Sequence, residues 1–147
     1  MRIYLDTCCL NRLTDDQSQP RIAEEAEAVE QILRLLRAKT IEWLSSAAVE
    51  AETSANPDLE RRHGVEVLLS LATSTVPLDR RIIERAKELE ALGYGAFDSL
   101  HLSSAEAGLA DVLLTTDDRL IKQAARAVGT PRVRVLNPVE WLWEQRA

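Results

Sequence analysis

Short runs of apolar residues alternate along this chain with longer segments in which apolar residues recur every three or four positions. Residues 21–39, for example, place Ile22, Val29 and Leu36 on one stripe, which is the spacing of an amphipathic helix. The short runs predict strands at residues 2–6, 41–46, 75–78, 111–115 and 133–136. The longer segments predict helices at 21–39, 80–92, 98–109 and 118–127, a helical segment through Glu50 and Glu52, a helix that begins at Asn56 and Pro57, and a short final helix from Pro138.

This alternation defines the fold class. Strands that alternate with helices of this length need crossover connections, which leave the strands parallel. The sequence therefore predicts an α/β protein, a three-layer α/β/α sandwich with a mostly parallel central sheet. No repeat, low-complexity tract or linker interrupts the pattern, and 147 residues can bury one core, so we expect a single domain over residues 1–147.

The composition argues against several classes of protein. No apolar run approaches the roughly 20 residues that a membrane span requires, so we expect no membrane association. The opening residues lack the apolar segment of a signal peptide, which favours the cytoplasm. Cys8 and Cys9 are neighbours that cannot easily bridge each other, and they lack the spaced partners of a zinc site, so we expect reduced thiols.

The net charge of −6 would ordinarily argue against a nucleic-acid partner, because phosphate binding depends on basic surface. There is one exception to that inference. Carboxylates that are gathered to hold divalent cations are neutralised when the cations bind, so the formal charge then says little about the bound state.

Several acidic residues stand where the predicted strands end. Asp6 ends the first strand, Glu52 follows the second, Asp98 opens a helix, and Asp117 ends the strand that contains the letters DVLLT. Ligands of open parallel sheets bind beyond the carboxyl ends of the strands. The sequence therefore predicts that these four carboxylates, from distant parts of the chain, converge at one edge of the sheet.

Each acid alone also has an ordinary structural interpretation. Asp6 could form a turn, and Asp98 could be the N-cap of its helix, although it shares a helix face with His101. Glu50 competes with Glu52, because the two are too close in sequence to face the same way on a helix. Asp118 likewise competes with Asp117: one could cap the following helix while the other faces the crevice. We favour Asp117 for the crevice and leave Asp118 to the helix.

Other polar and aromatic residues give weaker signals. His101 is a possible ligand or base, but a lone histidine on a largely apolar helix is more often a packing residue. Trp43, Trp141 and Trp143 are typical of core or interface anchors. No glycine-rich phosphate loop is present, and the serines lack a nucleophile elbow.

Four stretches carry a family resemblance: IYLDTCCLNR, SSAAVEAETSANPDLERR, AFDSLHLSSAEAGLADVLLTTDDRLIKQA and VRVLNPVEW. In this order they cover almost the whole chain, and they resemble PIN domains, more particularly the VapC-like toxin nucleases. The resemblance implies that the family's acidic quartet falls on Asp6, Glu52, Asp98 and Asp117. It also places polar supporting groups at Thr7, Asn11 and Thr116.

The resemblance implies a metal-dependent ribonuclease that is the toxin of a toxin–antitoxin pair, with an RNA substrate, a cognate antitoxin and a homodimeric state. Clustered carboxylates favour Mg²⁺ or Mn²⁺ over zinc. Asp6, Asp98 and Asp117 would hold the metal, and Glu52 would be a further ligand or would orient the attacking water. Mutual repulsion should raise the pKa of at least one of these acids. Candidate phosphate-steering cations are Arg12, Arg21, Arg61, Arg62 and Arg119.

Two other functions compete with this one. A catalytically silent PIN-like module could use the same acids to bind a metal or RNA. A receiver-like signalling domain also gathers acids at strand ends, but it needs an acidic pair after the first strand and a lysine after a late one. This chain has a single Asp6 and no lysine at the end of a predicted strand.

Overall fold

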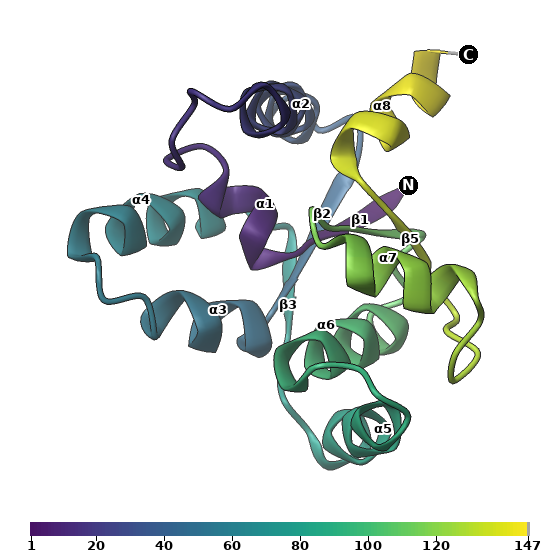
Figure 1. The fold of residues 1–147 in the computed structure, drawn as a ribbon. Coiled ribbons are helices and arrows are strands. Elements are labelled where there is room, and N and C mark those ends of the chain that lie inside the picture. The colour runs from purple at the N-terminus through teal and green to yellow at the C-terminus, as the bar shows by residue number, and fades with distance from the viewer. Residues whose placement is uncertain (147) are drawn as a thin grey trace.

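The structure, a computed structural model, describes residues 1–146. The strands are β1 (Arg2–Leu5), β2 (Glu42–Ser46), β3 (Ser74–Val76), β4 (Val112–Leu114) and β5 (Arg134–Leu136). The helices are α1 (Thr7–Asn11), α2 (Pro20–Arg37), α3 (Ala47–Ser54), α4 (Leu59–Leu69), α5 (Arg80–Ala91), α6 (Ala96–Ala107), α7 (Asp118–Ala125) and α8 (Pro138–Arg146). Strands and helices thus alternate as the hydrophobic pattern predicts (Figure 1).

The central sheet has five strands in the order β3-β2-β1-β4-β5, and every neighbouring pair is parallel. Strand β1 lies in the middle, where Ile3 is opposite Trp43 on one side and Val112 on the other. The predicted three-layer α/β fold is confirmed, and the sheet is entirely parallel rather than mostly so. Because the strands run the same way, the segments that follow β1, β2 and β4 all emerge at one edge.

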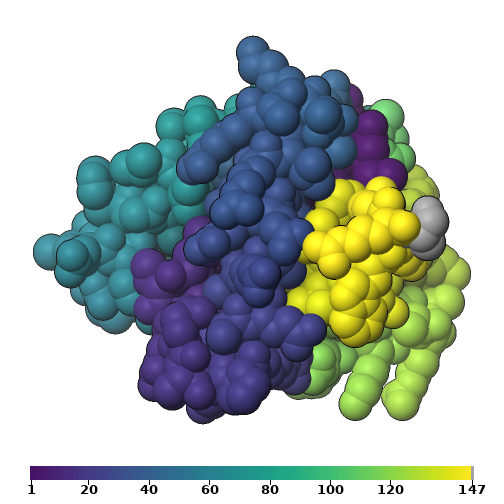
Figure 2. Space-filling model, turned by 90° about the horizontal axis from the view of Figure 1, so that it is seen from above, coloured from purple at the N-terminus to yellow at the C-terminus, as the bar shows by residue number. Residues whose placement is uncertain are grey.

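Helices cover both faces of the sheet. Helix α2 packs against α8 on one face, and α5 packs against α6, which contacts β2 and β4, on the other (Figure 1). Figure 2 shows α2 and α8 side by side from above. Trp43 and Trp141 are buried in the core between these layers, as anchors should be, whereas Trp143 of α8 is 61% exposed.

Most predicted element ends differ from the structure by one or two residues, and three helices show differences that have a physical reason. Helix α1 was not predicted, because its five residues are too few to show a period. Helix α4 begins at Leu59 with Asp58 as its N-cap, not at Asn56 and Pro57, since the Asp58 carboxylate accepts hydrogen bonds from two backbone amides of the first turn. Helix α6 begins at Ala96 with Gly95 as its N-cap. Asp98 therefore lies inside the first turn and is not the cap.

The described residues, 1–146, contain no helix that is both long enough and apolar enough to cross a membrane.

Candidate active site

The four predicted acids lie beyond the carboxyl ends of three adjacent strands. Asp6 directly follows β1, Glu52 is on α3 after β2, and Asp117 lies between β4 and α7. Asp98 joins them from the first turn of α6. The charges of Asp6, Asp117 and Glu52 all act on the Asp98 carboxyl group, but within residues 1–146 only Asp6 and Glu52, together with His101, form a group whose ligand atoms lie within 4.8 Å of one another.

Asp6 is a buried carboxylate, and only 4% of the residue is exposed. Its Oδ2 accepts a hydrogen bond of 2.8 Å from Thr115 Oγ1, and its Oδ1 lies 3.3 Å from His101 Nε2. Although Asp6 stands at the N-cap position of α1, its side chain makes no capping bond to the described chain. Both carboxylate oxygens therefore face the site, and the turn interpretation of Asp6 does not account for them.

Glu52 reaches the same site through His101. Its Oε1 lies 3.0 Å from His101 Nε2. One oxygen or nitrogen from each of Asp6, Glu52 and His101 lies within 4.8 Å of the other two. Burial alone would raise the pKa of Glu52, but the hydrogen bond from His101, helped by the buried Thr7 hydroxyl, holds that pKa below its usual value.

His101 is completely buried and belongs to this cluster, where the sequence had favoured a packing residue. Its Nδ1 lies 2.7 Å from Tyr4 Oη, which in turn lies 2.6 Å from Ser46 Oγ. Burial alone would lower the pKa of His101, but the neighbouring carboxylates, Asp6 foremost, raise it. The available signal was the position of His101 three residues after Asp98, which puts both on one face of α6.

The pKa of Asp98 is raised by its surroundings in the cluster. Burial, followed by the charges of Asp6 and Asp117, raises the pKa of Asp98 from 3.8 to about 6. The expectation that at least one acid has a raised pKa is thereby confirmed. Gly95 leaves room for this carboxylate, because a Cβ at that position would lie only 3.3 Å from Asp98 Oδ2.

The two aspartates after β4 separate in space. Asp117 is the N-cap of α7, and its Oδ1 accepts hydrogen bonds from the backbone amides of Arg119 at 2.9 Å and Leu120 at 3.3 Å. Asp118 is exposed and pairs through both oxygens, at 2.8 Å each, with Arg21. The prediction that Asp118 rather than Asp117 serves the following helix is therefore wrong. Asp117 caps α7, and its charge also acts on Asp98.

Glu50 does not take part in the cluster. It is exposed on the outer side of α3, whereas Glu52, two residues later, points inward to His101. The difference follows from the helix, in which residues two apart lie nearly opposite each other.

Threonines support the acids, but not in the predicted pattern. Thr115, which was not predicted, holds Asp6 and accepts the backbone N–H of Asp117 at 3.1 Å. Thr116 is buried and contributes its carbonyl oxygen to Arg21. Asn11 likewise contributes its carbonyl, to Arg61. The sequence signal for Thr115 was the pair of threonines, Thr115 and Thr116, before Asp117. Successive side chains of an extended segment point to opposite sides, so the two threonines cannot both face the same way.

Most of the candidate steering cations are already paired with acids. Arg12 bonds to Asp15 at 2.7 Å and to Glu25 at 2.9 Å, and Arg61 also pairs with Asp15. Glu25, which is only 2% exposed, further contacts Arg21 and accepts a 2.6 Å hydrogen bond from Asn137. Arg12, Arg21 and Arg61 are thus paired with acids of the chain itself.

The remaining two candidates differ from each other. Arg62 lies 3.6 Å from Glu66, one turn further along α4. Arg119 makes no ion pair within residues 1–146, and the only hydrogen bond of its guanidinium there is a long one, 3.5 Å, to the carbonyl of Gly93. Arg119 is therefore the candidate with a guanidinium still available next to Asp117.

The donor set fits a hard divalent cation. Four carboxylates at one edge offer the oxygen ligands that Mg²⁺ and Mn²⁺ prefer. The buried Thr7 hydroxyl has no hydrogen-bond partner of normal geometry within the described chain, which leaves a polar atom beside Glu52 for a ligand or water to satisfy. A bound cation would offset the charges of Asp6 and Asp117 that, after burial, raise the pKa of Asp98.

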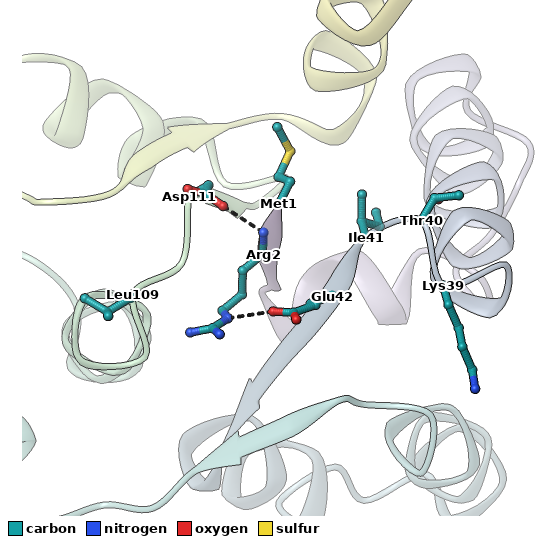
Figure 3. A pocket seen from close by; sticks show the side chains of 8 residues that line it. All are labelled: Met1, Arg2, Lys39, Thr40, Ile41, Glu42, Leu109 and Asp111. Carbon is teal, nitrogen blue, oxygen red and sulfur yellow. Dashed lines mark hydrogen bonds and ion pairs between the residues drawn. The ribbon is translucent and has the colours of Figure 1, made fainter.

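A cleft of about 520 Å³ lies elsewhere, at the amino ends of the strands, and is unconnected with these acids (Figure 3). In its lining, Arg2 Nε donates to Glu42 at 3.0 Å, while the Arg2 backbone N–H donates to Asp111 at 2.7 Å. Asp111, which stands just before β4, therefore lies at the amino ends of the strands and not among the four acids. Because β1 runs from this cleft to Asp6, the two places are at opposite edges of the sheet.

A parallel sheet with carboxylates beyond three neighbouring strand ends defines an α/β domain whose ligand site is acidic. A family model described as "PIN domain" matches residues 3–126, and the chain belongs to this family. A comparison with curated proteins finds no match.

Two solved structures show the same fold at low sequence identity. One is VapBC2 from Rickettsia felis, described as bound to a DNA fragment from their promoter, with a TM-score of 0.63, 20% identity, and coverage of 93% of this chain and 98% of that one. The other is VapBC-1 from nontypeable Haemophilus influenzae, with a TM-score of 0.61, 15% identity, and coverage of 94% and 98%.

The strand order also separates this chain from receiver-like domains. Those domains have the flavodoxin-like order 2-1-3-4-5. The order here, β3-β2-β1-β4-β5, is different, so the receiver-like alternative does not fit.

Proposed function

We propose that this protein is a Mg²⁺- or Mn²⁺-dependent endoribonuclease that hydrolyses phosphodiester bonds of RNA. One observation carries the proposal: four carboxylates from separate elements gather beyond the strand ends, where burial, followed by the charges of Asp6 and Asp117, raises the pKa of Asp98 to about 6. Such crowding costs stability, and a bound cation that a reaction requires would explain why the chain retains it. Membership of the PIN family supports a nuclease role.

We assign Asp6, Asp98 and Asp117 as the metal-holding residues. The charges of Asp6 and Asp117 both act on Asp98, and Asp117 keeps Oδ2 for a ligand, since Oδ1 is used in capping α7. A divalent ion bound there would polarise the scissile phosphate and lower the pKa of an attacking water. Its charge would also ionise Asp98 fully at neutral pH.

Glu52 is suited to orient the attacking water. His101 holds Oε1, and the lowered pKa keeps this carboxylate ionised and able to accept a hydrogen bond. Arg119, the cation without an ion pair in residues 1–146, is placed to contact a phosphate on the substrate strand. The chain thus supplies a carboxylate that accepts a hydrogen bond from water and a guanidinium without an ion pair in residues 1–146.

The same proposal extends to the biological role. We infer that the protein is the toxin of a type II toxin–antitoxin pair, acts in the cytoplasm as a single domain and a homodimer, and is neutralised by a cognate antitoxin protein. The similarity in fold to VapBC2 and VapBC-1 supports an antitoxin partner. Growth arrest on expression of the parent, but not of an Asp6→Asn variant, tests the toxin role.

The central test is cleavage of a mixed RNA pool with Mg²⁺, with Mn²⁺ and with chelator. Asp6→Asn and Asp98→Asn should each lower the rate at least about 100-fold, because each removes charge from the metal site. Asp118→Asn and Glu50→Gln are matched controls outside the cluster and should cleave like the parent. Undiminished cleavage by Asp6→Asn and Asp98→Asn would refute the proposal. Metal-induced stabilisation without cleavage of any RNA would indicate a silent binding module instead.

A further inference from the structure

His101 has two possible relations to the metal site. Its Nε2 lies 3.0 Å from Glu52 Oε1 and 3.3 Å from Asp6 Oδ1. Those distances suit an N–H that donates to both carboxylates, but they also suit a nitrogen lone pair that shares a metal with them. The ring cannot do both, because a protonated Nε2 has no lone pair to offer. The partner of the other ring nitrogen decides which is correct.

That partner is a buried chain of hydroxyl groups. Tyr4 Oη lies 2.7 Å from His101 Nδ1 and 2.6 Å from Ser46 Oγ, and Ser46 Oγ accepts the backbone N–H of Val49 at 3.2 Å. Tyr4, Ser46 and His101 are all 0% exposed, so bulk water cannot complete their hydrogen bonds. Every hydroxyl proton in the chain therefore needs an acceptor inside it.

Only one direction satisfies every proton. If Ser46 donates to Tyr4 and Tyr4 donates to Nδ1, both hydroxyl protons are used and the ring proton sits on Nε2. If instead Nδ1 donates to Tyr4 and Tyr4 donates to Ser46, the Ser46 proton has no acceptor among residues 1–146. A buried donor without a partner is costly, so the first direction is favoured.

We propose that His101 is a positioning residue that donates its Nε2–H to Glu52 and Asp6, and that the relay from Ser46 through Tyr4 fixes this tautomer and keeps His101 from ligating the metal. The inference deepens the proposed function and rests on it only in taking these acids as the metal site. Three elements supply the relay: Tyr4 from β1, Ser46 from the end of β2 and His101 from α6.

This arrangement has two effects on the site. The donated proton holds two carboxylates close together when no cation is bound, so the site does not have to be assembled on binding. It also leaves oxygen atoms as the ligands from this cluster, which favours Mg²⁺ and Mn²⁺ over ions that prefer imidazole.

The tautomer can be observed directly by ¹⁵N NMR on protein labelled at histidine. The chain has only two histidines, and exposed His63 serves as an internal reference. At about pH 8 we expect His101 to carry its proton on Nε2 and to leave Nδ1 unprotonated, both with chelator and with saturating Mg²⁺. A proton on Nδ1, or loss of the Nε2 proton when Mg²⁺ or Zn²⁺ is added, would overturn the proposal.

Substitution gives a second and independent readout, namely Mn²⁺ affinity by calorimetry. The amide nitrogen of glutamine can replace the Nε2–H, whereas leucine cannot donate. His101→Gln should bind Mn²⁺ within about 3-fold of the parent, and His101→Leu about 10- to 100-fold more weakly, the range for loss of an outer-shell partner. His63→Gln is the matched control and should be unchanged. An equal loss in His101→Gln and His101→Leu would contradict positioning by an N–H.

Tyr4→Phe keeps the ring and removes only the hydroxyl, so it tests the relay even if His101→Leu fails to fold. Without that hydroxyl the tautomer is no longer fixed, and we expect Mn²⁺ affinity to fall about 3- to 10-fold. Parent-like affinity together with an unchanged tautomer would overturn the relay. None of these measurements uses RNA, so they decide the role of His101 whether or not the protein proves to be a ribonuclease.

Discussion

Replacing Asp98 with asparagine should make the metal-free protein more stable while it abolishes activity. The pKa of this carboxyl group is about 6 in the folded chain, against an ordinary value of 3.8. Well below pH 3.8 the group is protonated in both states and contributes nothing to stability. As the pH rises to about 6, the unfolded chain releases the proton while the folded chain keeps it, so stability is lost. The loss is complete above that range.

The magnitude follows from the same values. Each pKa unit corresponds to about 1.36 kcal/mol, so a pKa about two units high would cost about 3 kcal/mol for a fully buried group. Asp98 is only half-buried, and solvent screening reduces this to about 1–2 kcal/mol. Asp98→Asn should therefore gain about 1–2 kcal/mol at about pH 8 and almost nothing at about pH 4.

Urea unfolding with chelator at the two pH values measures this difference. Asp118→Asn is the control: it loses the exposed ion pair with Arg21 and should be unchanged or slightly less stable, by about 0–1 kcal/mol. Saturating Mg²⁺ should cancel the gain in unfolding free energy of Asp98→Asn, because the parent binds the ion more tightly and is stabilised more by it. If Asp98→Asn is less stable than the parent at about pH 8 without metal, the crowding argument is wrong.

Three other outcomes are expected. Gly108→Ala should lose about 1–3 kcal/mol of unfolding free energy, since a Cβ there would lie 2.9 Å from Leu44 Cδ1 and Val76 Cγ2. Gly64→Ala, where a Cβ has nothing within 4 Å, should instead gain about 0.5–1 kcal/mol. Equal effects of the two substitutions in urea unfolding would contradict the packing around Gly108. Glu25→Ala should cost about 2–3 kcal/mol in urea unfolding, because it leaves Arg12 without its buried partner, and a neutral result would show that the ion pair adds nothing. Arg119→Ala should raise KM for RNA several-fold with little change in kcat, as expected for loss of a phosphate contact, and a fall in kcat alone would argue against that role.

The sequence was informative wherever a local pattern determines the structure. The period of apolar residues predicted the parallel sheet, because each strand and helix must bury one face in the same core. The strand ends predicted the edge where Asp6, Glu52 and Asp117 lie. These inferences depend on the order of elements and not on detailed side-chain geometry.

What the sequence did not predict depends on contacts between distant residues. His101 was taken for a packing residue because its partners, Tyr4 and Glu52, are 97 and 49 positions away. Thr115 was missed for the same reason, since Asp6 is 109 positions from it. Helix α1 is too short to be stable alone and exists because Cys9 and Leu10 pack into the core.

The central place of β1 has a consequence for when the site can form during synthesis. Strand β1 leaves the ribosome before both of its neighbours in the sheet, β2 and β4, and β4 begins only at Val112. Until that segment has emerged, Asp6 lacks the Thr115 hydroxyl that holds it, and Asp117 does not yet exist. Pairings this distant in sequence form late, because the loop between them must first be closed. A ribosome-bound or prematurely terminated chain that ends before this point would therefore carry an incomplete acid cluster, so the order of strands in the sheet postpones any activity until most of the chain has been translated.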